Sequence, residues 1–511
     1  MIQDVSPEID CGRYPIKRVP GEAIRVVSTI FTDGHDVVAA ALLHRREGDR
    51  DWIETPMTAV GNDRYAAEFT AGDLGCEVYT VRAWVDRFET WHRDLLKRVE
   101  AQQDISVDLL IGGDLIDEAA RRAGGPDREA LERWSERLLS AAEGGARTLP
   151  DHELSLLMSR HEEGRFPVEF ARELSATIDN PRARFGTWYE LFPRSATNER
   201  RHGTFADVEA RLPYIAGMGF DVLYLPPIHP IGHTNRKGKN NTTEPEAGAP
   251  GSPWAIGNED GGHTAVHPDL GTLDDFDNLI AHAREYGIEV AMDVAFQCSP
   301  DHPYVKEHPE WFRKRPDGSI QYAENPPKKY QDIYPIDFET DAWRELWDEL
   351  RDVVMFWAGR GVRIFRVDNP HTKSLRFWEW MIADVRRRYP DAVFLSEAFT
   401  RPAVMYHLAK IGFDQSYTYF TWRVTKRELV EYFTELTQTE VREYFRPNLW
   451  PNTPDILPEH LQIGGRPGFM QRLILAATLG TSYGIYGPAF ELLEQEPLLL
   501  GKEEYLDSEK Y

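Results

Sequence analysis

Short runs in which apolar and polar residues alternate occupy the first hundred positions of the chain. Four of them are separated by Asp-Gly, Gly-Asn or Gly-Asp breaks and lie at residues 23–31, 37–45, 64–69 and 78–84. A period of two is that of a half-buried β-strand, and the breaks carry residues that turns prefer. Several such strands in succession are typical of a small sandwich. We therefore predict an N-terminal β-sandwich over residues 1–100.

The apolar period changes to that of a helix after residue 100. Residues 127–142 and 150–160 carry apolar side chains at helical spacing, and Gly-Gly pairs separate these segments from their neighbours. The pattern predicts a charged helical module over residues 101–182. Its apolar faces could pack against one another or against a second subunit, and the pattern leaves both arrangements open.

Strand-like and helix-like segments alternate from residue 183 onward. The candidate strands lie at 187–192, 222–225, 289–294, 363–368, 392–397, 415–422, 449–452 and 482–486. Eight strands with helices between them indicate an α/β fold, a closed (β/α)₈ TIM barrel over residues 183–511, rather than an open sheet. Two connections, 229–272 and 298–341, are unusually long and rich in Trp, Tyr, Asn and Lys, which favours functional lids over disordered insertions.

The end of the sequence leaves little room for the last barrel helix. Tyr511 follows the eighth candidate strand by only a short segment. We therefore expect either a fragment of a longer protein or a barrel that closes in an unusual way.

Two neighbouring candidate strands each end in a carboxylate. One ends in Arg366-Val367-Asp368 and the next in Glu397, with a helix-like segment at 374–388 between them. This is the spacing of one β-α-β unit, so both acids should lie at the catalytic face of the barrel and can converge on one sugar. For either acid alone, helix capping or pairing with Arg366 is the simpler interpretation. The pair, together with a third candidate at Asp455, favours a catalytic site.

The composition limits the partners of this protein. It has 59 Lys and Arg against 84 Asp and Glu, a net charge of −25, so neither nucleic acid nor an anionic membrane is an expected partner. No segment approaches the ~20 apolar residues of a membrane span, and the start has no signal-peptide pattern. Cys11, Cys76 and Cys298 are widely spaced. We therefore expect no disulfide framework, no metal site and a reducing, cytoplasmic location.

The acidic motifs resemble those of a known superfamily. Residues 365–368, 395–397 and 452–455 are similar to the three acidic motifs of the α-amylase superfamily of retaining α-glycoside hydrolases and transglycosylases. More narrowly, the chain resembles the α-1,4-glucan:maltose-1-phosphate maltosyltransferase family. The segments that carry the narrower resemblance span essentially the whole chain, at 12–15, 188–195, 224–232, 252–257, 267–272 and 366–373.

The resemblance implies a fold and an activity. The implied fold has an N-terminal β-sandwich, a helical insertion used in dimerisation, a catalytic barrel and a C-terminal β domain that this sequence lacks. The implied activity moves a maltosyl unit from α-maltose 1-phosphate to the non-reducing end of an α-1,4-glucan and releases phosphate. The resemblance implies a homodimer and neither a cofactor nor a metal.

The resemblance also implies catalytic roles. Asp368 would be the nucleophile, Glu397 the acid and then the base, and Asp455 the acid that stabilises the transition state. In a retaining mechanism the first two carboxyl groups lie ~5–5.5 Å apart. Arg366 would keep Asp368 ionised and oriented, and Asp293 would be an acid near the reacting sugar with a largely structural role.

The implied substrate-binding residues are Lys239, Gln297, Asn325, Lys328, Tyr330, Arg366 and Asn369. Among them, Asn325, Lys328, Tyr330 and Asn369 would form the cradle of the donor phosphate, and Lys239 would contact the sugar. A solvated basic loop is the alternative for residues 236–241, and for Lys237 alone it is the favoured interpretation. Trp254 and Tyr330 are candidate platforms for a sugar ring, with packing in the core or on the surface as the alternative.

Two positions depart from the amylase pattern. The Asn-His pair that hydrolases carry after the third strand is Gln297-Cys298 here, and the usual His before the third acid is Pro454. Because those histidines grip the sugar in hydrolytic enzymes, their replacement argues against an ordinary amylase. The alternatives are an α-glucan hydrolase or other transglycosylase of the superfamily, and a non-catalytic glucan-binding homologue.

Overall fold

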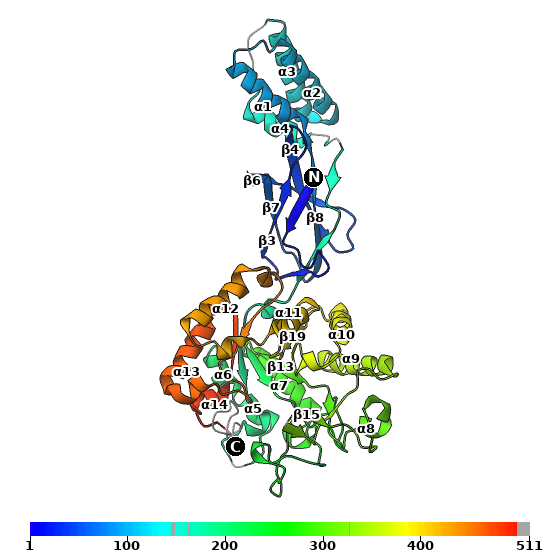
Figure 1. The fold of residues 1–511 in the computed structure, drawn as a ribbon, viewed down its shortest axis with the longest axis vertical. Coiled ribbons are helices and arrows are strands. Elements are labelled where there is room, and N and C mark those ends of the chain that lie inside the picture. Colours follow the sequence, from blue (N-terminus) through cyan, green and yellow to red (C-terminus); the bar gives the residue numbers. More distant parts are fainter. Residues whose placement is uncertain (145–148, 162–163, 165, 200, 327, 498–511) are drawn as a thin grey trace. The chain divides into compact units, whose positions relative to one another are not determined.

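The computed structural model describes residues 1–144, 149–161, 164, 166–199, 201–326 and 328–497. The described chain falls into two compact units (Figure 1). One comprises residues 1–16, 21–72 and 76–177, and the other comprises residues 17–20, 73–75 and 178 onward.

Two sheets form the predicted N-terminal sandwich. In the first sheet, the strands are antiparallel in the order β1 (Ile2–Ser6), β3 (Ala23–Ile30), β7 (Arg64–Thr70) and β6 (Thr58–Gly61). The second has the order β2 (Ile16–Arg18), β10 (Leu174–Ile178), β8 (Gly75–Asp86), β4 (Val37–Arg46) and β5 (Ile53–Pro56), with β9 (Val168–Glu169) beside β8. Along β3 the apolar side chains of Ile24, Val26 and Ile30 are buried, as the period of two predicts.

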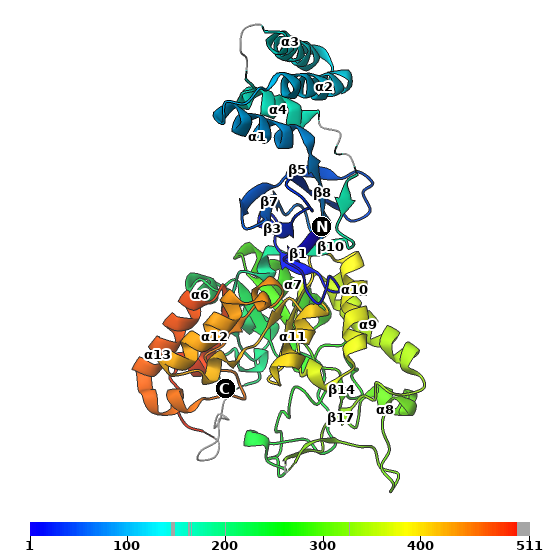
Figure 2. The ribbon, with the colours of Figure 1, turned by 45° about the horizontal axis from the view of Figure 1, so that its top comes forward.

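Helices α1 (Arg87–Glu100), α2 (Ser106–Arg122), α3 (Gly125–Ala142) and α4 (His152–Arg160) form a bundle (Figures 1 and 2). Their shared core includes Trp91, Leu95, Leu131 and Leu154. The first helix begins earlier than the sequence pattern indicated, because the carboxylate of Asp86 accepts a hydrogen bond from Glu89 N and caps the helix directly after β8. Strands β9 and β10 fall within residues 101–182 but pair with the second sheet, so that span is not purely helical.

The predicted barrel is present in the second unit. Its parallel strands follow the order β20, β19, β18, β13, β12, β11, β22 and β21, and a parallel bridge between Ser416 and Pro447 brings the two edges together. Their bounds are β11 Gly186–Glu190, β12 Val222–Leu225, β13 Glu289–Val294, β18 Ile364–Val367, β19 Val393–Ser396, β20 Gln415–Ser416, β21 Asn448–Leu449 and β22 Ser482–Tyr486.

The sixth barrel strand is shorter than predicted. Only Gln415–Ser416 is extended, because residues 419–422 form a 3₁₀ turn (η7) in which the Thr418 side chain accepts from Phe420 N. The seventh strand is also short, since Pro447 and Pro451 flank it and proline cannot donate to a ladder.

Helices surround these strands (Figure 2). Their bounds are α5 Phe205–Glu209, α6 Leu212–Gly217, α7 Leu273–Glu285, α9 Trp343–Gly359, α10 Leu375–Arg388, α11 Pro402–Lys410, α12 Lys426–Gln438, α13 Glu459–Leu479 and α14 Gly487–Glu491. Among the described residues, no helix combines the length and the apolar character that crossing a membrane requires.

The two long connections are folded against each other. The carboxylate of Asp301 in the second accepts from the backbone N–H groups of His233 (2.6 Å) and Thr234 (2.7 Å) in the first. Lys237 Nζ donates to Gln331 Oε1 at 2.9 Å. The elements of the two connections are η3 Lys239–Asn241, η4 Pro268–Leu270, β14 Gln297–Cys298, α8 Pro303–Glu307, η5 Pro309–Trp311, β15 Ala323–Asn325, β16 Lys328–Tyr330 and β17 Tyr334–Pro335.

Candidate active site

The charged cluster follows from the alternation of side chains along the barrel strands. Ala291, Ile364 and Leu395 fill the barrel interior, and residues two positions further along a strand face the same side. The buried residues reached in this way, at the ends of adjacent strands, are Asp293, Arg366, Asp368 and Glu397. The strand-end acids Asp368 and Glu397 are therefore brought together as the sequence predicted.

Arg366 joins three carboxylates in this cluster. Its Nη1 donates to Asp293 Oδ2 at 2.9 Å and to Asp368 Oδ1 at 3.0 Å. Its Nη2 lies 2.9 Å from Glu397 Oε1. The planar guanidinium presents its donors in a rigid fork, so one side chain can fix several carboxylates at once.

Asp368 and Glu397 are both bound to Arg366, and their pKa values move in opposite directions. Burial alone would raise the pKa of Asp368, but the charges of Arg366 and Lys373 outweigh it, and the net pKa is lowered. Burial raises the pKa of Glu397, Arg366 opposes this, and the charges of Asp368 and Asp455 raise it further. Glu397 is thus the proton donor of the pair and Asp368 the carboxylate.

An ionised carboxylate beside a protonated one is the arrangement that retaining glycoside chemistry requires. The ionised member can attack an anomeric carbon while the protonated member supplies a proton to the departing oxygen. The backbone fixes both groups, since Asp368 N donates to Val294 O and Glu397 N donates to Val367 O, each at 3.0 Å.

Two buried residues of the cluster were not identified from the sequence. Tyr224 on β12 donates its hydroxyl to Asp293 Oδ2 at 2.5 Å. Glu190 ends β11, is 2% exposed, and its Oε2 has no hydrogen-bond partner among the described residues. Burial raises the pKa of Glu190, although Arg366 opposes the shift. The apolar run continues through Leu191 and Phe192, so the sequence pattern did not place Glu190 at a strand end.

Asn369 and Asp455 lie beside the carboxylate pair. Asn369 N donates to Glu397 Oε2 at 3.4 Å, and its Nδ2 donates to Asp368 Oδ1 at 3.5 Å. Asp455 is exposed on the turn that Thr453 and Ile456 close. Its charge raises the pKa of both Glu397 and Tyr330, which places it within electrostatic reach of the site.

The predicted aromatic and amide residues of the loops are partly buried near one another. Trp254 and Tyr330 pack on a small cluster that contains Ile231 and Ile333, and Gln297 Nε2 donates to Trp254 O at 3.3 Å. The backbone of Asn325 pairs with that of Lys328 in the β15–β16 hairpin. The side chains of Asn325 and Lys328 lie outside the described part of the structure.

The basic loop differs from the prediction at one position. Lys239 is exposed, whereas Lys237 is only 4% exposed. The interpretation of Lys237 as a solvated side chain is therefore wrong. Its ammonium is enclosed between the two long connections because it donates to Gln331 Oε1, and local charge patterns do not reveal such a contact.

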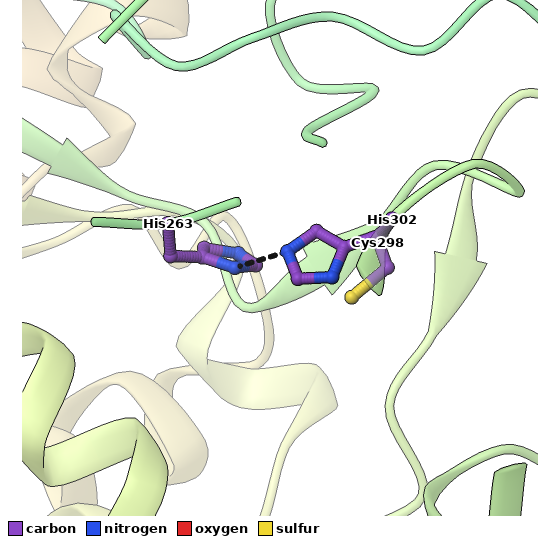
Figure 3. A group of neighbouring side chains, drawn as sticks. All are labelled: His263, Cys298 and His302. Atoms are coloured by element: carbon purple, nitrogen blue, oxygen red, sulfur yellow. Dashed lines mark hydrogen bonds between the residues drawn. The ribbon is translucent and has the colours of Figure 1, made fainter. Parts of the chain in front are cut away.

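His263, Cys298 and His302 are buried side chains that could hold a soft transition metal, since their donor atoms lie within 4.8 Å of one another (Figure 3). The two imidazoles are already hydrogen-bonded, Nδ1 of His263 to Nε2 of His302 at 3.1 Å. His263 Nε2 also donates to Ala295 O, and His302 Nδ1 accepts from Tyr304 N. A metal would have to replace the bond between the rings. A half-buried group at His202, His267 and Asp269 is similarly compact.

Two family models match separate parts of this chain. Residues 1–180 match the model "Alpha-1,4-glucan:maltose-1-phosphate maltosyltransferase, domain N/S", and residues 190–352 match "Alpha amylase, catalytic domain". A solved structure of a MutB mutant in complex with the substrate sucrose shares the fold, with a TM-score of 0.50 and 19% identity over 62% of this chain and 66% of that one.

Two relatives are similar over all of this chain. An α-1,4-glucan:maltose-1-phosphate maltosyltransferase of Chlorobaculum tepidum is 55% identical, and one of Rhodospirillum rubrum is 52% identical. In both cases the match covers 100% of this chain and 76% of the relative. With this identity over its whole length, the chain belongs to the α-1,4-glucan:maltose-1-phosphate maltosyltransferase family.

Proposed function

We propose that this protein transfers a maltosyl unit from α-maltose 1-phosphate to the non-reducing end of an α-1,4-glucan and releases phosphate. The observation that carries the proposal is the buried pair of Asp368 and Glu397, both held by Arg366 at the ends of adjacent barrel strands. The names of the relatives supply the donor and the acceptor.

The first step forms a glycosyl ester. A carboxylate oxygen of Asp368 attacks the anomeric carbon, the bond from that carbon to the phosphate oxygen breaks, and Glu397 gives its proton to the departing oxygen. In the second step Glu397, now ionised, takes the proton of the acceptor 4-hydroxyl. That oxygen then displaces Asp368, and two inversions give net retention.

The neighbouring residues support these steps. Arg366 keeps Asp368 ionised and aimed, and Asp455 binds sugar hydroxyls and stabilises the distorted ring of the transition state. Asp293 fixes Arg366 from the other side, because its Oδ2 accepts from both Arg366 and Tyr224. A burial-driven rise in the pKa of Glu397 supplies the proton donor at neutral pH.

The substrate-binding roles belong to the loops and to the turn after the nucleophile. In this proposal Asn325, Lys328, Tyr330 and Asn369 hold the donor phosphate through charge-assisted hydrogen bonds. Lys239 and Gln297 contact the maltosyl unit. Closure of the two folded connections over the site favours the glucan hydroxyl over water.

Phosphate release from maltose 1-phosphate, with and without maltohexaose, tests the proposal. We expect release that depends on the acceptor and a glucan extended by two glucose units. The Asp368→Asn variant is the matched control and should release none. Reducing sugar from starch without any use of phosphate would instead identify an α-glucan hydrolase, and glucan binding without turnover would identify a binding protein.

We also propose that the protein acts as a cytoplasmic homodimer. Its three cysteines, Cys11, Cys76 and Cys298, are all free thiols, which suits a reducing compartment. Helix α2 leaves Val107, Leu110 and Ile111 exposed at 67%, 44% and 46%, and an apolar face of this kind can pair with a second copy. Light scattering of the protein and of a Val107→Glu/Ile111→Glu variant measures this directly, with a dimer for the first and a monomer for the second.

A further inference from the structure

Lys373 follows the tight turn that begins directly after Asp368. Asn369 opens this turn with φ 43° and ψ 53°, a left-handed conformation that a non-glycine residue adopts only when its surroundings hold it there. A 3₁₀ turn (η6, Pro370–Thr372) then connects Asn369 to Lys373. The geometry of the turn decides where the Asn369 amide points.

The ammonium of Lys373 holds this turn from within. Nζ donates to the carbonyl oxygens of Asp368 and Asn369 and to Thr372 Oγ1, each at 3.3 Å. The Thr372 hydroxyl adds a bond to Asn369 O at 2.8 Å. An ammonium has three donors, so these bonds use all of them on oxygens that carry no formal charge. The positive charge itself is not neutralised by them.

Lys373 is a second cation beside the acidic cluster that Arg366 joins. Arg366 is shared among Asp293, Asp368 and Glu397. Burial lowers the pKa of Lys373 and Arg366 adds to this, the charges of Asp368, Glu397 and Asp293 oppose it, and the net pKa is lowered. His371 lies in the same turn, and burial lowers its pKa, with Lys373 adding to the effect and Asp368 opposing it. A phosphate that departs beside Asn369 therefore lies in the field of Lys373, in addition to its proposed contact with Lys328.

We propose that Lys373 makes this site selective for a donor with an anionic leaving group. It places a fixed positive charge behind the turn formed by Asp368 and Asn369, and it holds that turn in its left-handed form. The inference rests on the proposed function, in which phosphate departs beside Asn369. Lys373 is a positioning residue in this account, because it acts through the turn and through its field.

Charge and geometry can be separated with two donors that carry the same sugar. One is α-maltose 1-phosphate, and the other is α-maltosyl fluoride, whose leaving group is uncharged until the bond breaks. The measured quantity is the ratio of kcat/KM for the phosphate donor to kcat/KM for the fluoride donor. A defect in the turn lowers both values, whereas loss of the fixed charge lowers the ratio.

We expect Lys373→Met and Lys373→Gln to lower this ratio by about tenfold or more. Lys373→Arg should keep the ratio within about threefold of the wild type, even where both rates fall, because it keeps the charge. The control is Arg376→Met, which removes a cation whose side chain is 71% exposed on α10, and it should change neither rate. Turnover of the fluoride shows that each variant is folded.

A ratio that stays at the wild-type value in Lys373→Met and Lys373→Gln, with both rates lowered equally, would overturn the inference. The inference would also be overturned if Lys373→Arg lowered the ratio as much as Lys373→Met does. Failure of the proposed function looks different, because the wild type itself would then turn over the fluoride and release nothing from maltose 1-phosphate.

Discussion

The guanidinium of Arg366 lies 3.0 Å from the carboxylate of Asp368, Nη1 to Oδ1, with side chains only 6% and 10% exposed. The residues are two positions apart, so both face the barrel interior. The same guanidinium contacts Asp293 and Glu397. One cation therefore connects three neighbouring strand ends, and a change at Arg366 affects both catalytic carboxyl groups at once.

Substitution of Arg366 should impair both stability and transfer. Arg366→Met leaves buried carboxylates without their shared partner, and we expect the free energy of unfolding to fall by roughly 3–5 kcal/mol. Arg366→Lys keeps the charge but loses the fork that spans three acceptors, so it should recover much of the stability and little of the turnover. Urea denaturation and phosphate release measure the two effects. Wild-type turnover by Arg366→Lys would contradict this assignment.

The pH dependence of turnover should follow the two carboxyl groups. Asp368 must be ionised and Glu397 protonated in the first step, so kcat/KM should fall at both ends of the pH range. Burial makes the largest contribution to the raised pKa of Glu397; Arg366 opposes it, and the charges of Asp368 and then Asp455 add to it. Asp455→Asn removes a negative charge, so the pKa of Glu397 falls and the alkaline limb moves to lower pH. If the alkaline fall in kcat/KM of the Asp455→Asn variant occurs at the same pH as in the wild type, or at a higher pH, this prediction is refuted.

The buried histidines should make the barrel sensitive to mild acid. Burial lowers the pKa of His263 to about 4 and that of His229 to about 3. Because these pKa values lie below that of an unfolded histidine, the unfolded state binds more protons as the pH falls below ~6.5, and stability is lost. We expect roughly 2 kcal/mol of lost unfolding free energy per histidine between pH 7 and pH 5.

His263→Gln tests this sensitivity, since glutamine retains hydrogen-bonding capacity without titrating. The loss of unfolding free energy between pH 7 and pH 5, measured by urea denaturation, should be smaller in this variant than in the wild type. His282→Gln is the control, because the side chain of His282 is 51% exposed, and it should leave the loss unchanged. Equal losses in the wild type and in His263→Gln would count against the buried-histidine explanation.

Restoring the hydrolase-like histidine at position 298 should damage the fold rather than create an amylase. Cys298 is fully buried beside His263 and His302, so a larger ring there would overpack the site at a cost of about 1–3 kcal/mol. We expect Cys298→His to lower the thermal midpoint without new release of reducing sugar from starch. Cys11→His, at an exposed position, is the control. A stable Cys298→His variant that hydrolyses starch would contradict this.

The sequence predicted those parts of the site that depend on strand periodicity. Asp368 and Glu397 could be identified because each ends an apolar run, and the run fixes which side chains face inward. Glu190 ends β11 in the structure, but in the sequence Leu191 and Phe192 extend the apolar run beyond it, so the pattern gave no strand-end acid there. Tyr224 gave no separate signal, because a tyrosine in a buried strand is most often core.

The loops could not be predicted from local patterns. Lys237 is buried through a contact with Gln331, and Asp301 holds the loop at His233 and Thr234. These partners are many residues apart in the sequence, and neither apolar spacing nor charge runs encode such docking. Lys373 ends one of the segments that carry the family resemblance, but its bonds to the left-handed turn at Asn369 are visible only in the structure.

The most direct test of the central claim is a search for the covalent intermediate in a Glu397→Ala variant supplied with maltose 1-phosphate. Without the proton of Glu397 the phosphate leaves more slowly, but it still leaves because it is a weakly basic leaving group. The acceptor hydroxyl lacks its base altogether, so the ester should accumulate. Mass spectrometry of the digested protein should find one maltosyl group on the peptide that contains Asp368, and none when Asp368 is also replaced by alanine. A protein without the adduct, or with the maltosyl group on another residue, would contradict the account.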